Sequence, residues 1–357
     1  MATVKLVAFV FSPLQALNLL EYSQRFDRPV DVVVVGTLTG LETTSRTQIE
    51  AVLSLVKPRT IIYRTWLLSS GKPVRARRAV SSAATAVREH LTAGPYEFVV
   101  GEYRNSFSWA VLRRLGDVVR SVVVVDDGTA MLRIDRRRPT LLSRKALRLR
   151  LKSLIFLVFG VRGVLPPPAL TFFTTFALEA HLADSDTIVR NDYRTLSAEL
   201  RKLPPDEDSV YVIGTPHREA GVMDTGDVEL ALELARFAAE WTGKEVVYMA
   251  HRRERAEKLD ALRAEFTVVT PDVPFEIYPR VIGKQPRAVV GYYSSLFATV
   301  ADLMGDSVDI TALQIPRDSI NESWLPFVED VYRYYRTELA SAVKVIEHPT
   351  LSRGTRR

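Results

Sequence analysis

Two adjacent carboxylates, Asp126 and Asp127, follow a run of four valines at 122–125 and precede Gly128. A continuous apolar run predicts a strand that is covered on both faces, and catalytic groups of open α/β sheets gather beyond the carboxyl ends of such strands. One carboxylate beside another can have its pKa raised toward that of a general base, and Gly128 allows the chain to turn. The step therefore predicts a general base, although Asp-Asp-Gly is also ordinary turn chemistry.

Three polar segments in the second half of the chain each follow a predicted strand. Helix N-termini with free backbone N–H groups, supplemented by hydroxyl, imidazole and guanidinium side chains, bind the phosphates of nucleotides. The segments fall on one edge of the predicted sheet and together predict a phosphate site, although Ser294-Ser295 alone also fits plain N-capping. They are Gly214-Thr215-Pro216, His251-Arg252-Arg253-Glu254 and Tyr292-Tyr293-Ser294-Ser295.

Metal and covalent chemistry have little support in the sequence. The chain has no cysteine, and its five histidines show no paired spacing of the kind that a zinc site needs. Two Asp-x-Asp triplets, Asp184-Ser185-Asp186 and Asp206-Glu207-Asp208, lie in a polar stretch rather than after a predicted strand. Dinucleotide, Walker and nucleophile-elbow glycine motifs do not occur. We therefore expect no metal and no cofactor.

Predicted strands and helices alternate through both halves of the chain, which predicts parallel sheets. In the first half the predicted strands are 4–11, 31–35, 60–63, 96–100 and 121–125, and the predicted helices are 14–26, 42–55, 74–91 and 108–115. In the second half the predicted strands are 209–213, 245–249, 266–269, 288–291 and 308–313, and the predicted helices are 227–241, 252–265, 295–303 and 324–339.

A length of 357 residues favours two domains, and proline clusters at 166–168 and 204–205 are candidate boundaries. We place the boundary at the second cluster. Residues 1–205 then form an N-terminal Rossmann-like domain, and residues 206–357 form a C-terminal nucleotide-binding domain. The fold class is α/β, with two Rossmann-like domains facing across a cleft. Whether the last helix packs back on the N-terminal domain is left open.

Composition is that of an ordinary soluble protein, with 47% hydrophobic and 25% charged residues. The chain starts with a strand-like run rather than a signal peptide, and its longest apolar stretch is shorter than the ~20 residues that span a bilayer. We expect a cytoplasmic protein.

The net charge of +6 is concentrated in a basic helical segment at about 133–160. Basic and apolar residues alternate there, which predicts contact with anionic lipid or a polyanion, although a solvated helix face is the alternative. We assign six cations to acceptor or membrane contact and expect no nucleic-acid partner. They are Arg136, Arg137, Arg138, Arg144, Lys145 and Arg148.

These motifs, in this order, resemble those of bacterial GT-B sialyltransferases, including polysialyltransferases of the capsule or lipooligosaccharide type. The family pattern has an acidic-acidic-Gly motif in the N-terminal lobe, and a His-Pro motif and a Ser-Ser or Ser-Thr pair in the C-terminal lobe. Ser12-Pro13-Leu14-Gln15 is similar to the family's opening, and Pro274-Phe275-Glu276 also matches. The chain departs from the pattern at His251, which is followed by arginine rather than proline.

The resemblance implies a role for each matching residue. A carboxylate of the acidic pair would be the general base on the acceptor hydroxyl, and we favour Asp127 over Asp126. His251 and the Ser294-Ser295 pair would hold the CMP phosphate, and Glu276 would bond the ribose hydroxyls. Gly214, Thr215 and Arg252 complete the predicted donor set. Glu219 and Asp224 compete with the acidic pair for the role of base.

The sequence thus predicts an inverting, metal-independent transfer of sialic acid or a related nonulosonic acid from a CMP donor to a cell-surface glycan or glycolipid, which can be anionic. The basic segment would hold the enzyme peripherally on the inner membrane face. Two alternatives stay open: a GT-B transferase with another nucleotide sugar, and a noncatalytic polyanion-binding protein built around residues 133–152.

Overall fold

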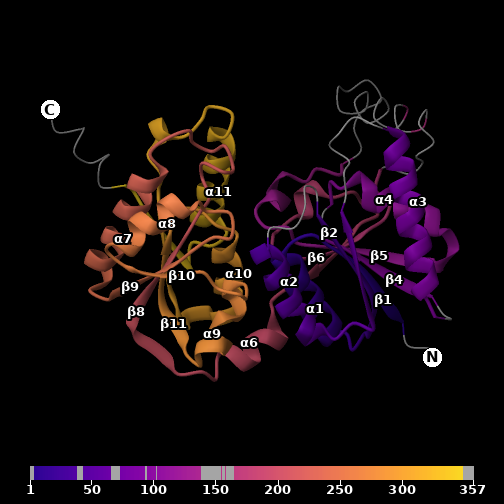
Figure 1. Ribbon diagram of the computed structural model, residues 1–357, viewed down its shortest axis with the longest axis horizontal. Helices are drawn as coiled ribbons and strands as arrows, with labels where there is room; N and C mark the ends of the chain where they lie inside the picture. The colour runs from indigo at the N-terminus through magenta and orange to yellow at the C-terminus, as the bar shows by residue number, and fades with distance from the viewer. Residues whose placement is uncertain are drawn as a thin grey trace. The chain divides into compact units, whose positions relative to one another are not determined.

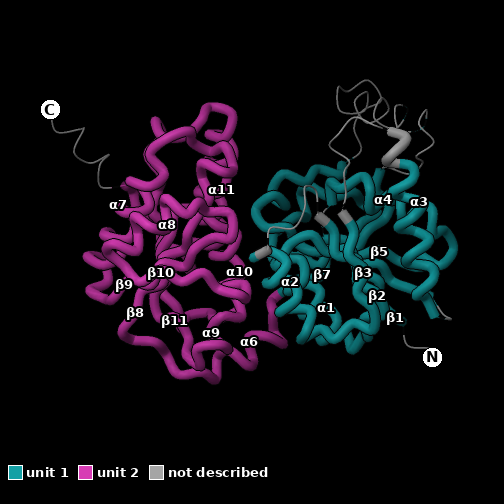
Figure 2. Tube along the Cα trace, in the orientation of Figure 1, with its two compact units in different colours: residues 1–191 teal, residues 192–357 magenta. Residues whose placement is uncertain are grey.

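The computed structural model describes residues 4–37, 43–65, 73–92, 95–101, 103–137, 154, 157 and 165–348. The chain divides into two compact units, residues 1–191 and 192–357, which are coloured separately in Figure 2. Each unit contains its own parallel sheet. The predicted α/β class is therefore confirmed for both halves of the chain.

The first unit contains a sheet of seven parallel strands in the order β3-β2-β1-β4-β5-β6-β7. Helices α1 and α2 pack together on one face, and α3 and α4 on the other (Figure 1). The bounds are β1 Lys5–Val10, α1 Pro13–Arg25, β2 Val30–Thr37, α2 Thr43–Val56, β3 Thr60–Thr65, α3 Pro73–His90, β4 Tyr96–Val100, α4 Ser106–Leu115, β5 Val119–Val125, β6 Thr171–Thr174 and β7 Thr187–Arg190.

Strand β1 is central in this sheet because its apolar residues are buried on both faces. Leu6, Val7, Ala8 and Phe9 are all fully buried, and β1 pairs with β2 on one side and β4 on the other. The chain leaves β1 toward β2 and later returns to the opposite side of β1 as β4. The strand order therefore reverses between β1 and β4, which is where open α/β sheets bind ligands at their carboxyl edge.

The second unit contains a sheet of six parallel strands in the order β10-β9-β8-β11-β12-β13. Helices α7 and α8 lie on one face, and α10 and α11 on the other (Figure 1). The bounds are α6 Arg194–Leu200, β8 Pro205–Ile213, α7 Asp227–Thr242, β9 Glu245–Met249, α8 Ala256–Arg263, β10 Thr267–Val269, α9 Tyr278–Ile282, β11 Gln285–Gly291, α10 Leu296–Met304, β12 Asp309–Leu313, α11 Leu325–Thr337 and β13 Val343–Ile346.

The pairing register of this sheet aligns three strand ends. Ile213 of β8 pairs with Met249 of β9 on one side and with Gly291 of β11 on the other. Two of the predicted phosphate-binding segments begin directly after Ile213 and Gly291, and the third begins at His251, two residues after Met249. The strand order reverses between β8 and β11, so the segments converge on the carboxyl edge at the reversal point of the second sheet.

The division between the units and the start of one helix differ from the predictions. The two units divide before α6 rather than after Pro205, because Pro205 already belongs to β8 and α6 contacts α10 of the second unit. The helix predicted over 252–265 begins only at Ala256, because residues 251–254 form a turn closed by the Glu254 N–H on the His251 carbonyl. Helix α11 packs against β13.

Most of the predicted basic helical segment lies outside the described residues, including Arg138, Arg144, Lys145 and Arg148. In the part of the chain that the structure does describe, no helix has both the length and the apolar character needed to cross a bilayer.

Candidate functional site

Asp126 is a buried carboxylate at the carboxyl end of β5. Its side chain is 2% exposed, and Oδ2 accepts the backbone N–H of Thr175 at 2.7 Å. Burial raises the pKa of Asp126 to about 6, against the opposing effect of hydrogen bonds from Thr174 and Thr175. The Asn18 amide donates to the Asp126 carbonyl at 3.1 Å. Asp126 therefore ties the end of β5 to the segment after β6.

Asp127 lies in a different environment from its neighbour. It is only partly buried, and its Oδ1 accepts a hydrogen bond from Gln15 Nε2 at 2.6 Å. Gly128 follows with a φ of 70°, a left-handed conformation that glycine adopts without strain. The turn therefore sends two consecutive carboxylates to different partners, and Asp127 is the more accessible of the two.

His251 follows β9 and presents its ring as a hydrogen-bond donor. Its Nδ1 accepts the backbone N–H of Arg253 at 3.2 Å, so the neutral ring carries its proton on Nε2. Burial, with the charges of Arg252, Arg253 and Lys258, holds the pKa of His251 well below its usual range. The ring is therefore neutral at pH 7 and offers an Nε2–H group that suits a phosphate oxygen.

A buried ion pair lies beneath this turn. Lys258 Nζ contacts Glu254 Oε1 at 2.6 Å, and both side chains are almost fully buried. Glu254 Oε2 accepts the His251 N–H at 2.7 Å, and Oε1 accepts the Tyr248 hydroxyl at 2.7 Å. Lys258 also donates to the Thr215 carbonyl at 2.9 Å. The pair therefore joins the turn after β9 to the turn after β8.

Gly214 stands where these two turns approach each other. A Cβ there would lie 2.8 Å from the Met249 carbonyl oxygen and 3.0 Å from the His251 nitrogen, and it would also overlap the Glu254 carboxylate. The Gly214 N–H donates to the Met249 carbonyl at 2.9 Å. A side chain at position 214 would therefore push the two turns apart.

Glu276 is buried in the short helical turn Phe275–Ile277. Burial raises the pKa of Glu276 to about 7, while the positive charge of Arg252 opposes the rise. Arg252 therefore lies near enough to act on Glu276 electrostatically, which brings two of the predicted donor residues together. Near neutral pH this carboxyl group exists in both charged and protonated forms.

Ser294 and Ser295 precede α10, and the aromatic helix α11 holds their backbone. Ser294 Oγ accepts the N–H of Leu296, the first residue of α10, at 3.2 Å, whereas the N-cap residue Ser295 makes no side-chain capping bond. The Tyr335 hydroxyl donates to the Ser294 carbonyl at 2.6 Å and accepts the Ser294 N–H at 2.9 Å. The two serines therefore follow the carboxyl end of β11, and only Ser294 bonds the first backbone N–H of α10 through its side chain.

Sequence reasoning missed His217, which follows the Gly214-Thr215-Pro216 segment. Its side chain is 2% exposed, and its ring lies between Tyr292 and Tyr293 at centroid distances of 5.5 and 5.7 Å. Burial, together with Lys258, lowers the pKa of His217 to about 3. Nε2 has no hydrogen-bond partner among the described residues. His217 is therefore a neutral packing residue beneath the predicted site.

Gln15, Glu254 and Lys258 were also not assigned roles from the sequence. Gln15 belongs to the quoted opening Ser12-Pro13-Leu14-Gln15, and Glu254 and Lys258 are four residues apart after a predicted strand. That spacing on charged residues is common on helix surfaces, so it does not by itself indicate a buried pair.

Arg136, which the sequence assigned to acceptor or membrane contact, is largely buried and has its own carboxylate partner. Its side chain is 7% exposed and forms a bidentate pair with Asp186, at 2.6 and 2.8 Å. It also donates to the carbonyls of Pro167 and Pro168. Arg136 therefore joins the segment after β5 to the segments that precede β6 and β7, and Asp186 is its partner rather than a solvated carboxylate.

Arg137, by contrast, is exposed and lies within 3.3 Å of Asp135. With Arg104 and Arg133 it lines a pocket of about 540 Å³ in the first unit, which is bounded by the prolines at 166–168. Arg133 and Arg137 belong to the predicted basic segment, whereas Arg104 lies outside it.

The competing carboxylates have partners of their own. Glu219 lies 3.2 Å from Arg255 Nε, and Asp224 accepts a hydrogen bond from Asn321 at 3.2 Å. Both are in the loop between β8 and α7. Within the described ranges, no three His, Asp or Glu side chains cluster as metal ligands would.

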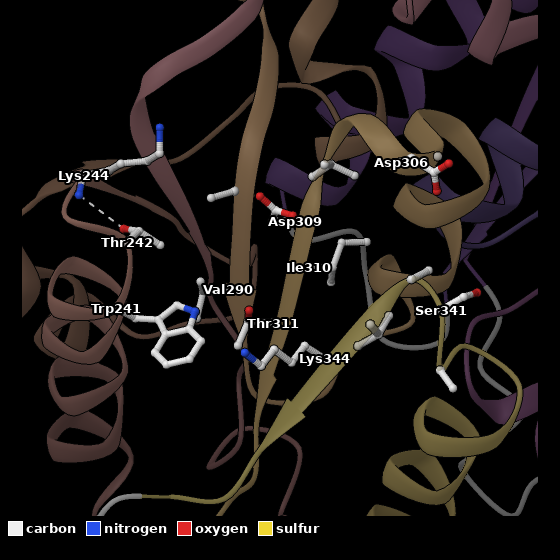
Figure 3. Close-up of a pocket in the computed structure, with 16 residues that line it drawn as sticks. Trp241, Thr242, Lys244, Val290, Asp306, Asp309, Ile310, Thr311, Ser341 and Lys344 are labelled. Carbon is white, nitrogen blue, oxygen red and sulfur yellow. Dashed lines mark hydrogen bonds between the residues drawn. The ribbon is translucent and has the colours of Figure 1, made fainter.

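A second pocket, of about 590 Å³, lies elsewhere in the second unit (Figure 3). Asp309 begins β12 and Val343 begins β13, so the pocket lies toward the amino ends of these strands. Two of the lining residues contact each other: Lys344 Nζ lies 4.4 Å from the centroid of the Trp241 ring. None of the described residues predicted to bind the donor lines this pocket.

Comparison with known proteins shows similarity at the level of the fold. No protein-family model matches the chain, and no curated protein matches it in sequence. An α/β-galactoside α-2,3-sialyltransferase from the luminous marine bacterium Photobacterium phosphoreum is similar in structure, with a TM-score of 0.52 and 12% identity over 97% of this chain and 99% of that chain. A Listeria monocytogenes structure proposed to be a UDP-N-acetylglucosamine 2-epimerase has a TM-score of 0.50 and 12% identity, over 97% and 85% of the two chains. The chain therefore has the GT-B fold class, with one Rossmann-like sheet in each of its two units.

Proposed function

We propose that the protein is an inverting, metal-independent glycosyltransferase that moves sialic acid or a related nonulosonic acid from a CMP donor to a cell-surface glycan. The observation that carries the proposal is the chemistry at the carboxyl edges of the two sheets. Asp127 follows β5 in one unit, and His251 and Ser294 follow β9 and β11 in the other. The GT-B fold class supports the same reading, since a bacterial sialyltransferase shares it.

The second unit would bind the donor nucleotide. His251 Nε2–H and the serine hydroxyls before α10 are neutral donors for a phosphate, and the N-terminus of α10 adds a positive partial charge. Arg252 supplies a full charge beside Glu276, whose carboxyl group would bond the ribose hydroxyls. This set includes donors for the phosphate and an acceptor for the sugar of one nucleotide.

Transfer would be a single displacement at the anomeric carbon. The acceptor hydroxyl oxygen forms the new bond while Asp127 takes its proton, and the bond between the anomeric carbon and the phosphate oxygen breaks with its electron pair. CMP leaves with that electron pair, and His251 and the serines stabilise its charge. One displacement inverts the anomeric centre, and a nucleoside monophosphate leaves without metal assistance.

The first unit would bind the acceptor. The pocket lined by Arg104, Arg133 and Arg137 has the charge to hold an anionic glycan, and its lining residues at 133–137 follow the Asp126-Asp127-Gly128 turn in the chain by only a few residues. The basic segment that continues from Arg137 would add peripheral contact with an anionic inner membrane face.

A donor panel tests the proposal. Purified protein is incubated with CMP-sialic acid, UDP-N-acetylglucosamine and a GDP-sugar, each with and without EDTA, and nucleotide release is measured. We expect release of CMP alone, unchanged by EDTA. If only the UDP- or the GDP-sugar is turned over, the protein is instead a GT-B transferase that uses that nucleotide sugar. Salt-sensitive glycan binding without turnover of any sugar, unchanged in Asp127→Asn and His251→Gln, would support the noncatalytic reading.

A further inference from the structure

The carboxamide of Gln15 has a fixed orientation beside Asp127. The Gln15 side chain is 1% exposed, and its Oε1 accepts the backbone N–H of Phe11 at 2.7 Å. Because the oxygen is taken by a backbone donor, the amide nitrogen must point the other way, where Nε2 donates to Asp127 Oδ1 at 2.6 Å. The bond therefore has one direction, from the amide to the carboxylate.

The fold holds this side chain from two further sides. Ser12 caps α1 by accepting the Gln15 N–H at 3.3 Å, which fixes the backbone from which the side chain leaves. Gly101, directly after β4, gives the side chain its space, because a Cβ there would lie 2.6 Å from Gln15 Cγ and would overlap the carboxamide. Residues that follow β1, β4 and β5 thus meet at Gln15.

We propose that Gln15 is the positioning residue for the base of the transfer reaction. An N–H donor on a carboxylate favours its ionised form, which is the form that can accept a proton from the acceptor hydroxyl. The same bond fixes the plane in which the carboxylate lies. Gly101 supports this positioning because it has no side chain that would displace the Gln15 carboxamide. This inference rests on the proposed function, because it assigns Gln15 a role only if Asp127 is the base.

Gln15→Glu is the variant that separates positioning from packing. The glutamate has the same length, and its Oε1 can still accept the Phe11 N–H. It loses the N–H donor to Asp127 and places a second carboxylate there, so the pair will hold a proton to higher pH. Gln24→Glu is the matched control, because it adds the same charge to α1 at an exposed position. Gly101→Ala displaces the Gln15 side chain without adding charge.

The experiment measures kcat and donor KM from pH 5 to pH 9 in the full chain. We expect Gln15→Glu to lower kcat at pH 7 at least tenfold, to move the acid limb of the kcat profile up by one pH unit or more, and to leave the donor KM within twofold. Gly101→Ala should lower kcat and move the limb up by less than Gln15→Glu does, because it removes the N–H donor without adding a carboxylate, and Gln24→Glu should match the wild type.

A second measurement does not depend on turnover. The Tm of Gln15→Glu should fall at pH 7, and Asp127→Asn in the same chain should restore it, because the amide and the carboxylate then exchange places across the same bond. The inference would be overturned if the Tm of Gln15→Glu falls as expected but the acid limb of its kcat profile coincides with that of the wild type. A wild-type protein without CMP-sugar turnover would instead refute the proposed function.

Discussion

Asp126 and Asp127 are consecutive carboxylates that the turn after β5 sends to different partners: Asp126 to the backbone N–H of Thr175, and Asp127 to the amide of Gln15. The first is fully buried, and the second is partly exposed. A base must be reachable by its substrate, so this relationship favours Asp127 for that role and leaves Asp126 to hold the end of the strand.

Asp126→Asn tests the structural role. A carboxyl group whose pKa is about 6 in the folded chain and about 3.9 in the unfolded chain binds more protons when folded, so wild-type stability falls as pH rises from about 4 to about 6. Asparagine cannot ionise, so the stability of the variant relative to the wild type should rise by up to about 3 kcal/mol over that range. Urea unfolding at pH 4 and pH 7 measures this, and an identical pH dependence in both proteins would refute it.

Lys258→Met tests the buried ion pair. Removing the cation leaves the Glu254 carboxylate charged and buried, which typically costs about 3–5 kcal/mol of stability. Glu254→Gln in the same chain should recover a large part of the loss. Arg263→Met is the matched control on α8, because its pair with Asp260 is exposed and is worth less than about 1 kcal/mol. Equal destabilisation of the two single variants would contradict the structure.

Glu276→Gln tests the ribose contact through pH. Because the pKa of Glu276 is about 7, the charged form that accepts two ribose hydroxyls is lost as pH falls below 7. Calorimetric titration of the wild type with CMP should therefore show affinity that weakens toward pH 6. The glutamine variant should bind more weakly at pH 8 and vary less than the wild type from pH 6 to pH 8, because only the CMP phosphate, with a second pKa of about 6, still titrates there. A wild-type affinity that does not vary over this range would remove Glu276 from the site.

His217→Phe tests the cost of a buried imidazole. The pKa of His217 is about 3 in the folded chain and near 6.5 when unfolded, so the unfolded chain binds more protons and stability is lost as pH falls below 6.5. The loss grows by about 1.4 kcal/mol for each pH unit while His217 stays neutral. Phenylalanine preserves the contacts with Tyr292 and Tyr293 and should remove this part of the acid sensitivity. A variant as acid-sensitive as the wild type would contradict this account.

Much of the architecture was predictable because its strands are continuous apolar runs. Strands β4 and β9 have the predicted bounds. Strand β5 differs only at its start, and its end was predicted correctly because a run of four valines indicates a buried strand. Strands β6, β7 and β13 were not predicted. Each is four residues long. Strand β7 has only exposed or half-buried residues, and in β13 only Val343 is buried, so neither gives a clear alternation.

The site could be predicted only in part. Strand ends can be read from the sequence, so the segments that contain His251 and Ser294 were found at one edge of the sheet. The side chains that hold them were not found, because the contact between Gln15 and Asp127 joins residues far apart in the chain. The pair of Arg136 with Asp186 was not found for the same reason, since Asp186 lies fifty residues away in sequence.

Release of CMP from CMP-sialic acid, measured in the wild type and in the Asp127→Asn and His251→Gln variants, tests the central claim most directly. Asp127→Asn conserves the shape of the side chain, and His251→Gln replaces the imidazole by a neutral polar group. We predict that the wild type forms CMP in the presence of a glycan acceptor and that both variants lose at least about 100-fold in rate while unfolding at wild-type temperatures. No release of CMP by the wild type, or wild-type rates in both variants, would contradict the account.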